Sequence, residues 1–213
     1  MQSHQLARYF WDQWGERYQQ VAPTIEQRIK SFLHVPEEQY FYELCFCLCT
    51  PQSKAENALQ VQQQLEALNF QFADVDPLPL LRDPRHYIRF HRQKAERLCW
   101  LKAHWQIVAS GLAKAETVTA KRQFLVRTVK GLGWKEASHF LRNIGYLDVA
   151  VIDRHIVRMM AEIGILSRMV VPGSEKQYKI IEKIFCDFAR AVGLTPAHLD
   201  LFLWSLRTGM VIK

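Results

Sequence analysis

The helical spacing of apolar residues most constrains what this 213-residue chain can fold into. Ala137, Phe140, Leu141 and Ile144 fall at i, i+3, i+4 and i+7, which places them on one face of a helix. The same pattern covers the stretches 156–163, 181–192 and 199–206. Earlier stretches with helical character are 4–20, 24–33, 37–50, 53–68, 92–110 and 118–129. Since no β-hairpin signal is present, we expect an all-α fold of about ten helices, with a groove between an N-terminal and a central lobe.

Glycine and proline positions indicate where these helices end or begin. Gly111, Gly145, Gly164 and Gly193 lie where helices are expected to stop. Thr195 followed by Pro196 is typical of a helix start. The stretch 72–90 contains three prolines, each preceded by Asp or Leu, and is the main irregular connection that we expect.

Composition excludes several classes of protein. Hydrophobic residues make up 49% of the chain and charged residues 23%, which is too apolar for a disordered chain. No stretch reaches the ~18 uncharged apolar residues of a membrane span, and the N-terminus lacks the apolar segment of a signal peptide. We therefore expect a soluble intracellular protein with no membrane partner, cytoplasmic or nucleoid-associated in a prokaryote. The formal net charge of +7 makes a polyanion a plausible partner.

A Gly-Leu-Gly turn at 131–133 joins two of the expected helices. Gly131 and Gly133 allow a tight turn, Leu132 can enter the core, and amide N–H groups at the next helix start can face a phosphate. This is the pattern of a helix-hairpin-helix motif, over about 118–145. An ordinary interhelical turn would share the two glycines, so the turn alone does not decide between them.

Lys135 follows this turn in the first turn of the next helix. The positive end of a helix disfavours an ammonium, and partial burial adds to the effect. A lysine that is partly neutral can attack a carbon at the aldehyde oxidation level and form a Schiff base. The alternative is an ordinary solvated surface lysine.

Asp153 comes after the apolar run 149–152 and before the helix that carries Ile156, which is an N-cap position. Capping alone would explain it, with a contribution of roughly 1 kcal/mol. A carboxylate held in this way would also stay ionised and could stabilise a developing cation or accept a proton from Lys135. The two roles are compatible.

The residues 130–145 and 152–156 closely resemble the signature of a known family. The sequence Lys-Gly-Leu-Gly-Trp-Lys-Glu-Ala-Ser-His-Phe-Leu-Arg-Asn-Ile-Gly, followed by Ile-Asp-Arg-His-Ile, is similar to the second, archaeal-type class of 8-oxoguanine DNA glycosylase/lyases. These belong to the helix-hairpin-helix DNA glycosylases. The resemblance covers nearly the whole chain as a single unit, 1–213, of two interleaved helical lobes. It implies a two-lobed fold with the active site in the cleft between the lobes.

The resemblance also implies a reaction and two catalytic residues. The enzyme would act in DNA base excision repair, removing 8-oxoguanine from double-stranded DNA after the nucleotide is extruded from the duplex. Lys135 would be the Schiff-base nucleophile, and Asp153 would assist departure of the base. β-Elimination would then cut the strand on the 3′ side of the lesion. Alternatives are a lyase of the same superfamily for another lesion or for abasic sites, and a non-catalytic DNA-binding module.

Three residues are expected to hold the oxidised base. Trp204 lies off the apolar stripe of the last helix, and the resemblance makes it one wall of the base pocket. Phe90 resembles the opposite stacking wall, where stacking is worth roughly 1–3 kcal/mol per base. Lys213 resembles the terminal lysine whose carboxylate would accept hydrogen bonds from the base. The structural alternatives are a second core face for Trp204, a hydrophobic staple for Phe90 and a frayed terminus for Lys213.

Other residues are expected to contact the DNA around the lesion. The turn that carries Gln52, between two early helices, resembles the place where related glycosylases insert a polar side chain into the gap that the extruded base leaves. The resemblance makes Gln52 the candidate for this role, although Ser53 could simply cap the next helix there. The remaining candidates are basic residues and the hairpin glycines: Arg89, Arg92, Lys94, Lys130, Gly131, Gly133 and Arg154. For Arg89, Arg92 and Lys94, a solvated helix start is an equal alternative.

The cysteines argue against a disulfide framework and against an iron–sulfur cluster. Their number, five, is odd, and only Cys186 lies in the last hundred residues, where related iron–sulfur enzymes carry four. Cys45, Cys47 and Cys49 are better explained as small buried side chains than as metal ligands. We therefore expect an enzyme without cofactor or metal, acting as a monomer.

Overall fold

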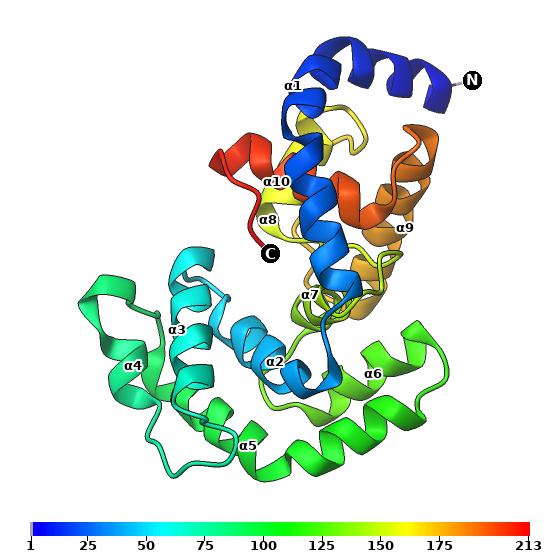
Figure 1. Cartoon of the computed structure of the whole chain (residues 1–213). Coiled ribbons are helices and arrows are strands. Elements are labelled where there is room, and N and C mark those ends of the chain that lie inside the picture. Colours follow the sequence, from blue (N-terminus) through cyan, green and yellow to red (C-terminus); the bar gives the residue numbers. More distant parts are fainter. Residues whose placement is uncertain (1) are drawn as a thin grey trace. The chain divides into compact units, whose positions relative to one another are not determined.

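Every regular element within residues 2–213, the part that this computed structural model describes, is a helix (Figure 1). The α-helices are α1 (Gln2–Leu33), α2 (Tyr40–Cys49), α3 (Ala55–Ala67), α4 (Leu78–Arg82), α5 (His91–Lys114), α6 (Val118–Thr128), α7 (Trp134–Asn143), α8 (Arg154–Glu162), α9 (Glu175–Ala191) and α10 (Pro196–Thr208). Two short 3₁₀ helices are η1 (Glu37–Gln39) and η2 (Pro84–His86). The all-α prediction is confirmed.

The chain divides into two compact units. One unit is continuous and comprises Val35–Phe140. The other combines the chain up to His34 with Leu141–Lys213, so it joins the two ends of the sequence. The boundary between them falls within α7. We describe each unit by itself.

The unit built from the two chain ends has a core made by α1, α8, α9 and α10. Helix α1 packs against α9 and α10, and α10 also packs against α8 and α9. Phe10 of α1 is fully buried, with its ring centroid 5.4 Å from that of Phe188 and 6.0 Å from that of Phe202, both edge to face. Such pairs stabilise a core beyond the area they bury, and here they join the first helix to the last two.

The continuous unit is organised around α2. All but the first residue of this helix are buried, and it packs against α3 and α5. Cys45, Cys47 and Cys49 all have no exposed surface, which confirms that they are packed as small core side chains.

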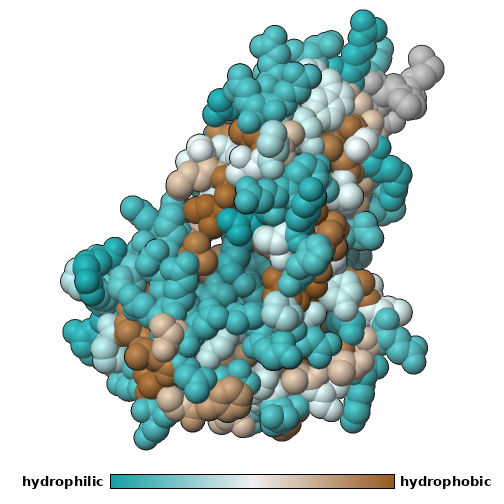
Figure 2. Space-filling model, in the orientation of Figure 1, coloured by the Kyte–Doolittle hydropathy of each residue, from teal (hydrophilic) through white to brown (hydrophobic). Residues whose placement is uncertain are grey.

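Figure 2 shows hydrophilic residues over most of the visible face of the molecule, with hydrophobic residues in smaller patches.

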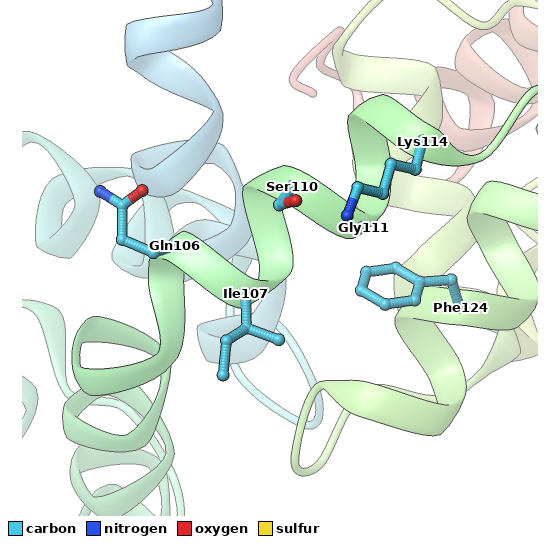
Figure 3. A pocket seen from close by; sticks show the side chains of 6 residues that line it. All are labelled: Gln106, Ile107, Ser110, Gly111, Lys114 and Phe124. Carbon is cyan, nitrogen blue, oxygen red and sulfur yellow. The ribbon is translucent and has the colours of Figure 1, made fainter.

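Two helix boundaries differ from the prediction. Helix α1 runs through Pro23, where a break was expected. Phe10 and Ile25, on either side, are fully buried, so packing outweighs the preference of proline for a helix end. Helix α5 also continues past Gly111 to Lys114. A side chain at position 111 would overlap the ring of Phe124 from α6 (Figure 3). Gly111 permits close packing rather than ending the helix.

The other turn predictions are confirmed. Gly145, Gly164 and Gly193 follow helices with φ of 97°, 85° and 76°, the left-handed conformation that glycine adopts without strain. Thr195 caps α10, since its hydroxyl accepts a hydrogen bond from the amide of His198 at 3.3 Å. The expected irregular connection contains the short helices α4 and η2.

Candidate functional site

The turn between α6 and α7 has the geometry expected of a helix-hairpin-helix. Gly131 has φ 85°, and a Cβ at this position would overlap the side chain of Arg97 from α5. Leu132 is 5% exposed and enters the core, as predicted. Its amide donates to the carbonyl of Val129 at 3.1 Å, which closes the turn. The first glycine is therefore required both by the backbone conformation and by the neighbouring helix.

Lys135 is the second residue of α7, and its side chain is 28% exposed. Its Nζ lies 2.9 Å from Oε1 of Glu136. The other carboxylate oxygen of Glu136 accepts a hydrogen bond from the amide of Gly133 at 3.2 Å. Glu136 thus fixes the helix start and holds the ammonium of Lys135 at the same time. The prediction did not include Glu136, although a Glu in the first helical turn is a known capping signal.

Lys94 does not lie on the surface, contrary to the expectation that it faces DNA. It is 1% exposed. Its Nζ donates to the carbonyl oxygens of Cys49 at 2.7 Å and Pro51 at 2.6 Å, and to Oγ of Ser53 at 3.1 Å. The prediction grouped Lys94 with the basic residues Arg89 and Arg92, which are exposed. Lys94 instead donates its three N–H groups to the turn between α2 and α3.

Ser53 does not cap α3, contrary to the alternative considered for this turn. Lys54 occupies the cap position, without a side-chain hydrogen bond. Instead, Oγ of Ser53 accepts from Lys94 and, at 3.0 Å, from the amide of Arg89. The turn that carries Gln52 and the turn that carries Phe90 are therefore bonded to each other.

Gln52 and Phe90 both have left-handed backbones, with φ of 57° and 58°. Both residues are exposed, Phe90 by 52%. Phe90 precedes the first residue of α5 but does not pack as a buried staple. The guanidinium of Arg89 lies 5.8 Å from the centre of its ring. Two adjacent turns thus present a polar side chain and an aromatic ring to solvent.

The basic candidates in the continuous unit are exposed, apart from Lys94. Arg89, Arg92 and Lys130 all lie on the surface, and so does Gly131. Gly133 is partly exposed. Exposed cations beside a glycine turn at a helix start are suited to binding phosphate groups.

Asp153 lies in the unit built from the chain ends and caps α8 as predicted. Its Oδ1 accepts hydrogen bonds from the amides of His155 and Ile156, each at 2.8 Å. Both bonds use the same oxygen, which leaves Oδ2 outside the cap. Arg154, the first residue of α8, is exposed, and its Nε lies 3.4 Å from Nε2 of His155.

Side chains from α9 hold the segment that leads to Asp153. The hydroxyl of Tyr178 donates to the carbonyl of Ala150 at 2.8 Å and accepts from the amide of Ile152 at 3.1 Å. A carboxylate oxygen of Glu182 accepts from the amide of Ala150 at 3.3 Å. These two residues satisfy backbone groups of a segment that lies outside the helices. The prediction missed them, because nothing local in the sequence marks their partners.

A buried ion pair lies in the same unit. Arg142 donates to Oδ2 of Asp200, and both side chains are 4% exposed. Burial raises the pKa of Asp200 to about 7, Arg142 opposes this rise, and the charge of Asp153 adds to it. Asp153 therefore lies in the electrostatic environment of a second carboxylate.

The remaining candidates lie at the C-terminal end of the chain. Trp204 on α10 is partly exposed, while its neighbours Leu203 and Ser205 are buried. Lys213 is also partly exposed. The predicted residues are thus divided between the two units, with Lys135, Phe90 and Gln52 in one and Asp153, Trp204 and Lys213 in the other.

Other features of the described chain do not coincide with these residues. A pocket of about 480 Å³ lies between α5 and α6 (Figure 3), lined by Gln106, Ile107, Ser110, Gly111, Lys114 and Phe124. Among residues 2–213, no three His, Cys, Asp or Glu side chains group in a way that could hold a metal ion. No helix in this part of the chain is long and apolar enough to cross a bilayer.

Comparison with known protein families and curated proteins agrees with this geometry. The sequence profile of the helix-hairpin-helix family described as 8-oxoguanine DNA glycosylase matches residues 25–194. A protein of Methanocaldococcus jannaschii named 8-oxoguanine DNA glycosylase/AP lyase is 38% identical over 197 residues, covering 91% of this chain and 94% of that protein. A protein of Thermotoga maritima with the same name is 34% identical, covering 92% and 94%.

Solved structures agree as well. The crystal structure of the M. jannaschii 8-oxoguanine glycosylase/lyase in complex with a 15mer DNA containing 8-oxoguanine matches with a TM-score of 0.83 and 32% identity, covering all of both chains. The crystal structure of the T. maritima 8-oxoguanine DNA glycosylase matches with a TM-score of 0.85 and 30% identity, covering 97% of this chain and all of that one.

Proposed function

Because this chain belongs to the 8-oxoguanine DNA glycosylase family, we propose that it excises 8-oxoguanine from DNA and cleaves the strand at the resulting abasic site. The observation that carries the proposal is Lys135, half-buried on the first turn of α7 directly after the glycine hairpin. It lies within the matched region, as does Asp153. The relatives' shared name covers both activities, glycosylase and AP lyase.

We propose that Lys135 is the nucleophile. The target nucleotide has to leave the base stack, because its anomeric carbon is otherwise out of reach. The ammonium of Lys135 first loses a proton, and Oε1 of Glu136 lies 2.9 Å away as an acceptor. The amine then forms a bond to C1′ while the bond between C1′ and the base breaks, and the base leaves with that electron pair and takes up a proton.

Strand cleavage follows from the same covalent bond. Opening of the sugar ring gives an imine between Lys135 and C1′. The imine acidifies the proton on C2′, which passes to the released base. Its electron pair forms a double bond between C2′ and C3′, and the C3′–O bond breaks so that the phosphate leaves with the bonding electrons. Water then hydrolyses the imine and restores the lysine. No external oxidant or reductant is required for this sequence.

Asp153 is assigned the role of stabilising the positive charge that develops on the sugar as the base departs. Only its Oδ1 is used in capping α8, so a carboxylate oxygen is left for this purpose. Phe90 and Trp204 are proposed as stacking walls for the extruded base, with Lys213 as a polar contact to it. Gln52 is proposed to fill the gap in the duplex.

The remaining DNA contacts are assigned to the exposed basic residues and the hairpin. Arg89, Arg92, Lys130 and Arg154 are proposed to bind phosphate groups together with the backbone at Gly131 and Gly133. We further propose that the enzyme acts as a monomer and needs no metal or iron–sulfur cluster. The positions of the five cysteines, with three within α2, Cys99 on α5 and Cys186 on α9, support the proposal that no iron–sulfur cluster is needed.

Borohydride trapping tests the proposed mechanism. Borohydride reduces the imine and so links the protein covalently to a duplex with one 8-oxoguanine opposite cytosine. We expect an adduct with the wild-type protein and none with Lys135→Gln. Lys114→Gln, which changes an exposed lysine at the end of α5, is the matched control and should leave the adduct unchanged.

Undamaged and abasic duplexes complete the experiment. Adducts on the abasic duplex only would keep the lyase reaction but refute 8-oxoguanine as the substrate. No adduct on any duplex, with DNA binding intact, would instead indicate a non-catalytic binding module. An adduct with Lys135→Gln equal to that of the wild type would refute the assignment of the nucleophile.

A further inference from the structure

The buried ammonium of Lys94 is the feature that the proposed reaction leaves unexplained. It is 1% exposed, although lysine is almost never fully buried without partners. Burial lowers the pKa of Lys94 to about 8, so at neutral pH it is mainly an ammonium with three N–H donors. Three acceptors surround it: two backbone carbonyls and one hydroxyl. Burying an ammonium costs desolvation free energy that an apolar side chain would not. We therefore expect a role that requires the charge and its three donors.

Its acceptors belong to the turn that carries Gln52. The carbonyls of Cys49 and Pro51 and the hydroxyl of Ser53 lie before and after that residue. Gln52 itself has φ 57°, which is strained for any residue with a Cβ. Such a backbone conformation persists only where the surrounding structure holds it. Here the three hydrogen bonds from the ammonium of Lys94 hold the residues on both sides of Gln52.

The same ammonium is also connected to the turn that carries Phe90. Lys94 is in the first turn of α5, and its amide donates to the carbonyl of Phe90 at 3.0 Å. Oγ of Ser53, which accepts from Nζ, also accepts from the amide of Arg89 at 3.0 Å. Phe90 has φ 58°, the second strained backbone in this cluster.

One more hydrogen bond joins the two turns independently of Lys94. Nδ2 of Asn57 donates to the carbonyl of Tyr87 at 3.0 Å. The segments 49–57 and 87–94 therefore form one hydrogen-bonded unit, with Lys94 and Ser53 at its centre. Only the exposed side chains of Gln52 and Phe90 project from its two strained positions.

We propose that Lys94 is a positioning residue for base excision, whose buried ammonium fixes the Gln52 turn and the Phe90 turn in one frame. The inference rests on the proposed function, in which Gln52 fills the gap in the duplex and Phe90 stacks on the extruded base. Both events happen in the same step, so the two side chains have to be presented together. Lys94 acts through them. Its charge also lies within electrostatic range of Lys135 and Glu136, an influence that excision and abasic trapping share.

The test compares two reactions of one variant. Lys94→Met keeps the length and apolar stem of the side chain but removes its three donors. We expect single-turnover excision of 8-oxoguanine to fall about tenfold or more, since small misplacements of positioning groups have effects of this size. Trapping of a preformed abasic duplex, which has no base to stack, should change much less. A general loss of folded protein would lower both reactions equally.

Lys102→Met is the matched control. Lys102 is on the same helix, and its ammonium also donates to a backbone carbonyl, that of Ala73, in a different loop. Losing that bond should leave both reactions near wild-type rates. If Lys94→Met does not fold, Ser53→Ala removes the shared acceptor with a smaller change and should likewise lower excision more than abasic trapping.

A double-mutant cycle decides whether Lys94 acts through the two turns. In a Gln52→Ala or Phe90→Ala background, the effect of Lys94→Met on excision should shrink, because the group being positioned is absent. Strictly additive effects, or equal losses in excision and abasic trapping, would overturn the inference. Wild-type protein that forms no adduct with any duplex would instead overturn the proposed function, so the two failures are distinguishable.

Discussion

Replacing Asp153 with asparagine should separate its structural role from its proposed chemical role. Both capping hydrogen bonds, from the amides of His155 and Ile156, end on Oδ1. The carbonyl oxygen of an asparagine can accept both, and asparagine is as good an N-cap as aspartate. What Asp153→Asn removes is the negative charge and Oδ2. Asp153→Ala removes the cap as well.

The two variants should therefore differ in stability and agree in activity. Loss of the charge near the helix start should cost about 0.5 kcal/mol of unfolding free energy, whereas loss of the cap should cost about 1–2 kcal/mol. For a chain of this size, 1 kcal/mol shifts the Tm by roughly 2–4 °C. Excision should fall about 10²–10³-fold in both variants, the usual loss for one preorganised stabilising group.

Thermal unfolding by circular dichroism and single-turnover excision, at one ionic strength, measure the two quantities. Lys114→Gln serves as the unchanged reference in both. An Asp153→Asn protein that excises 8-oxoguanine at the wild-type rate would refute the need for the carboxylate. One that unfolds at as low a temperature as Asp153→Ala would refute the capping argument.

Three further predictions concern stability. Arg142→Met leaves Asp200 buried without its cation and should lower the unfolding free energy in urea denaturation by up to about 3–5 kcal/mol, the full cost applying where the carboxyl stays ionised, above its pKa of about 7; an unchanged midpoint there would refute the ion pair. Gly131→Val should cost at least ~1–2 kcal/mol because of its φ of 85°. Since the backbone at Gly131 is proposed to bind a phosphate group, the variant should also weaken DNA binding, measured by fluorescence anisotropy; unchanged binding and stability would contradict the hairpin geometry. The pKa of Lys94 is about 8 in the folded protein and 10.5 in the unfolded chain. Between pH 8 and pH 10.5 the unfolded chain therefore binds more protons than the folded protein. The unfolding free energy should rise with pH across this range, by at most about 3 kcal/mol. Wild type and Lys94→Met should differ in this slope, and equal slopes would contradict the burial of the charge.

The sequence predicted the features whose causes are local. Asp153 caps the helix that begins one residue later, and the glycines at 131 and 133 shape a turn of five residues, so the interactions lie within a few positions. The helical spacing identified nearly every helix for the same reason. The resemblance to a known family then supplied the chemistry that the local patterns leave open.

Features with distant causes could not be predicted. Lys94 finds its acceptors more than forty residues earlier in the chain, and Tyr178 meets Ala150 across 28 positions. Gly111 marks a close approach of Phe124 and not a helix end, which only the packing of α5 against α6 reveals. In each case the residue type permits several roles, and a partner outside any local window selects one.

The discontinuous composition of one unit has a consequence for how the protein is made. Helix α1 leaves the ribosome well before the rings of Phe188 and Phe202, which pack against its Phe10. At about 5–20 residues per second, the apolar face of α1 waits on the order of ten seconds for these partners. The Val35–Phe140 unit is contiguous and can fold in that interval. A nascent chain therefore carries an uncovered, aggregation-prone helix until α9 and α10 emerge.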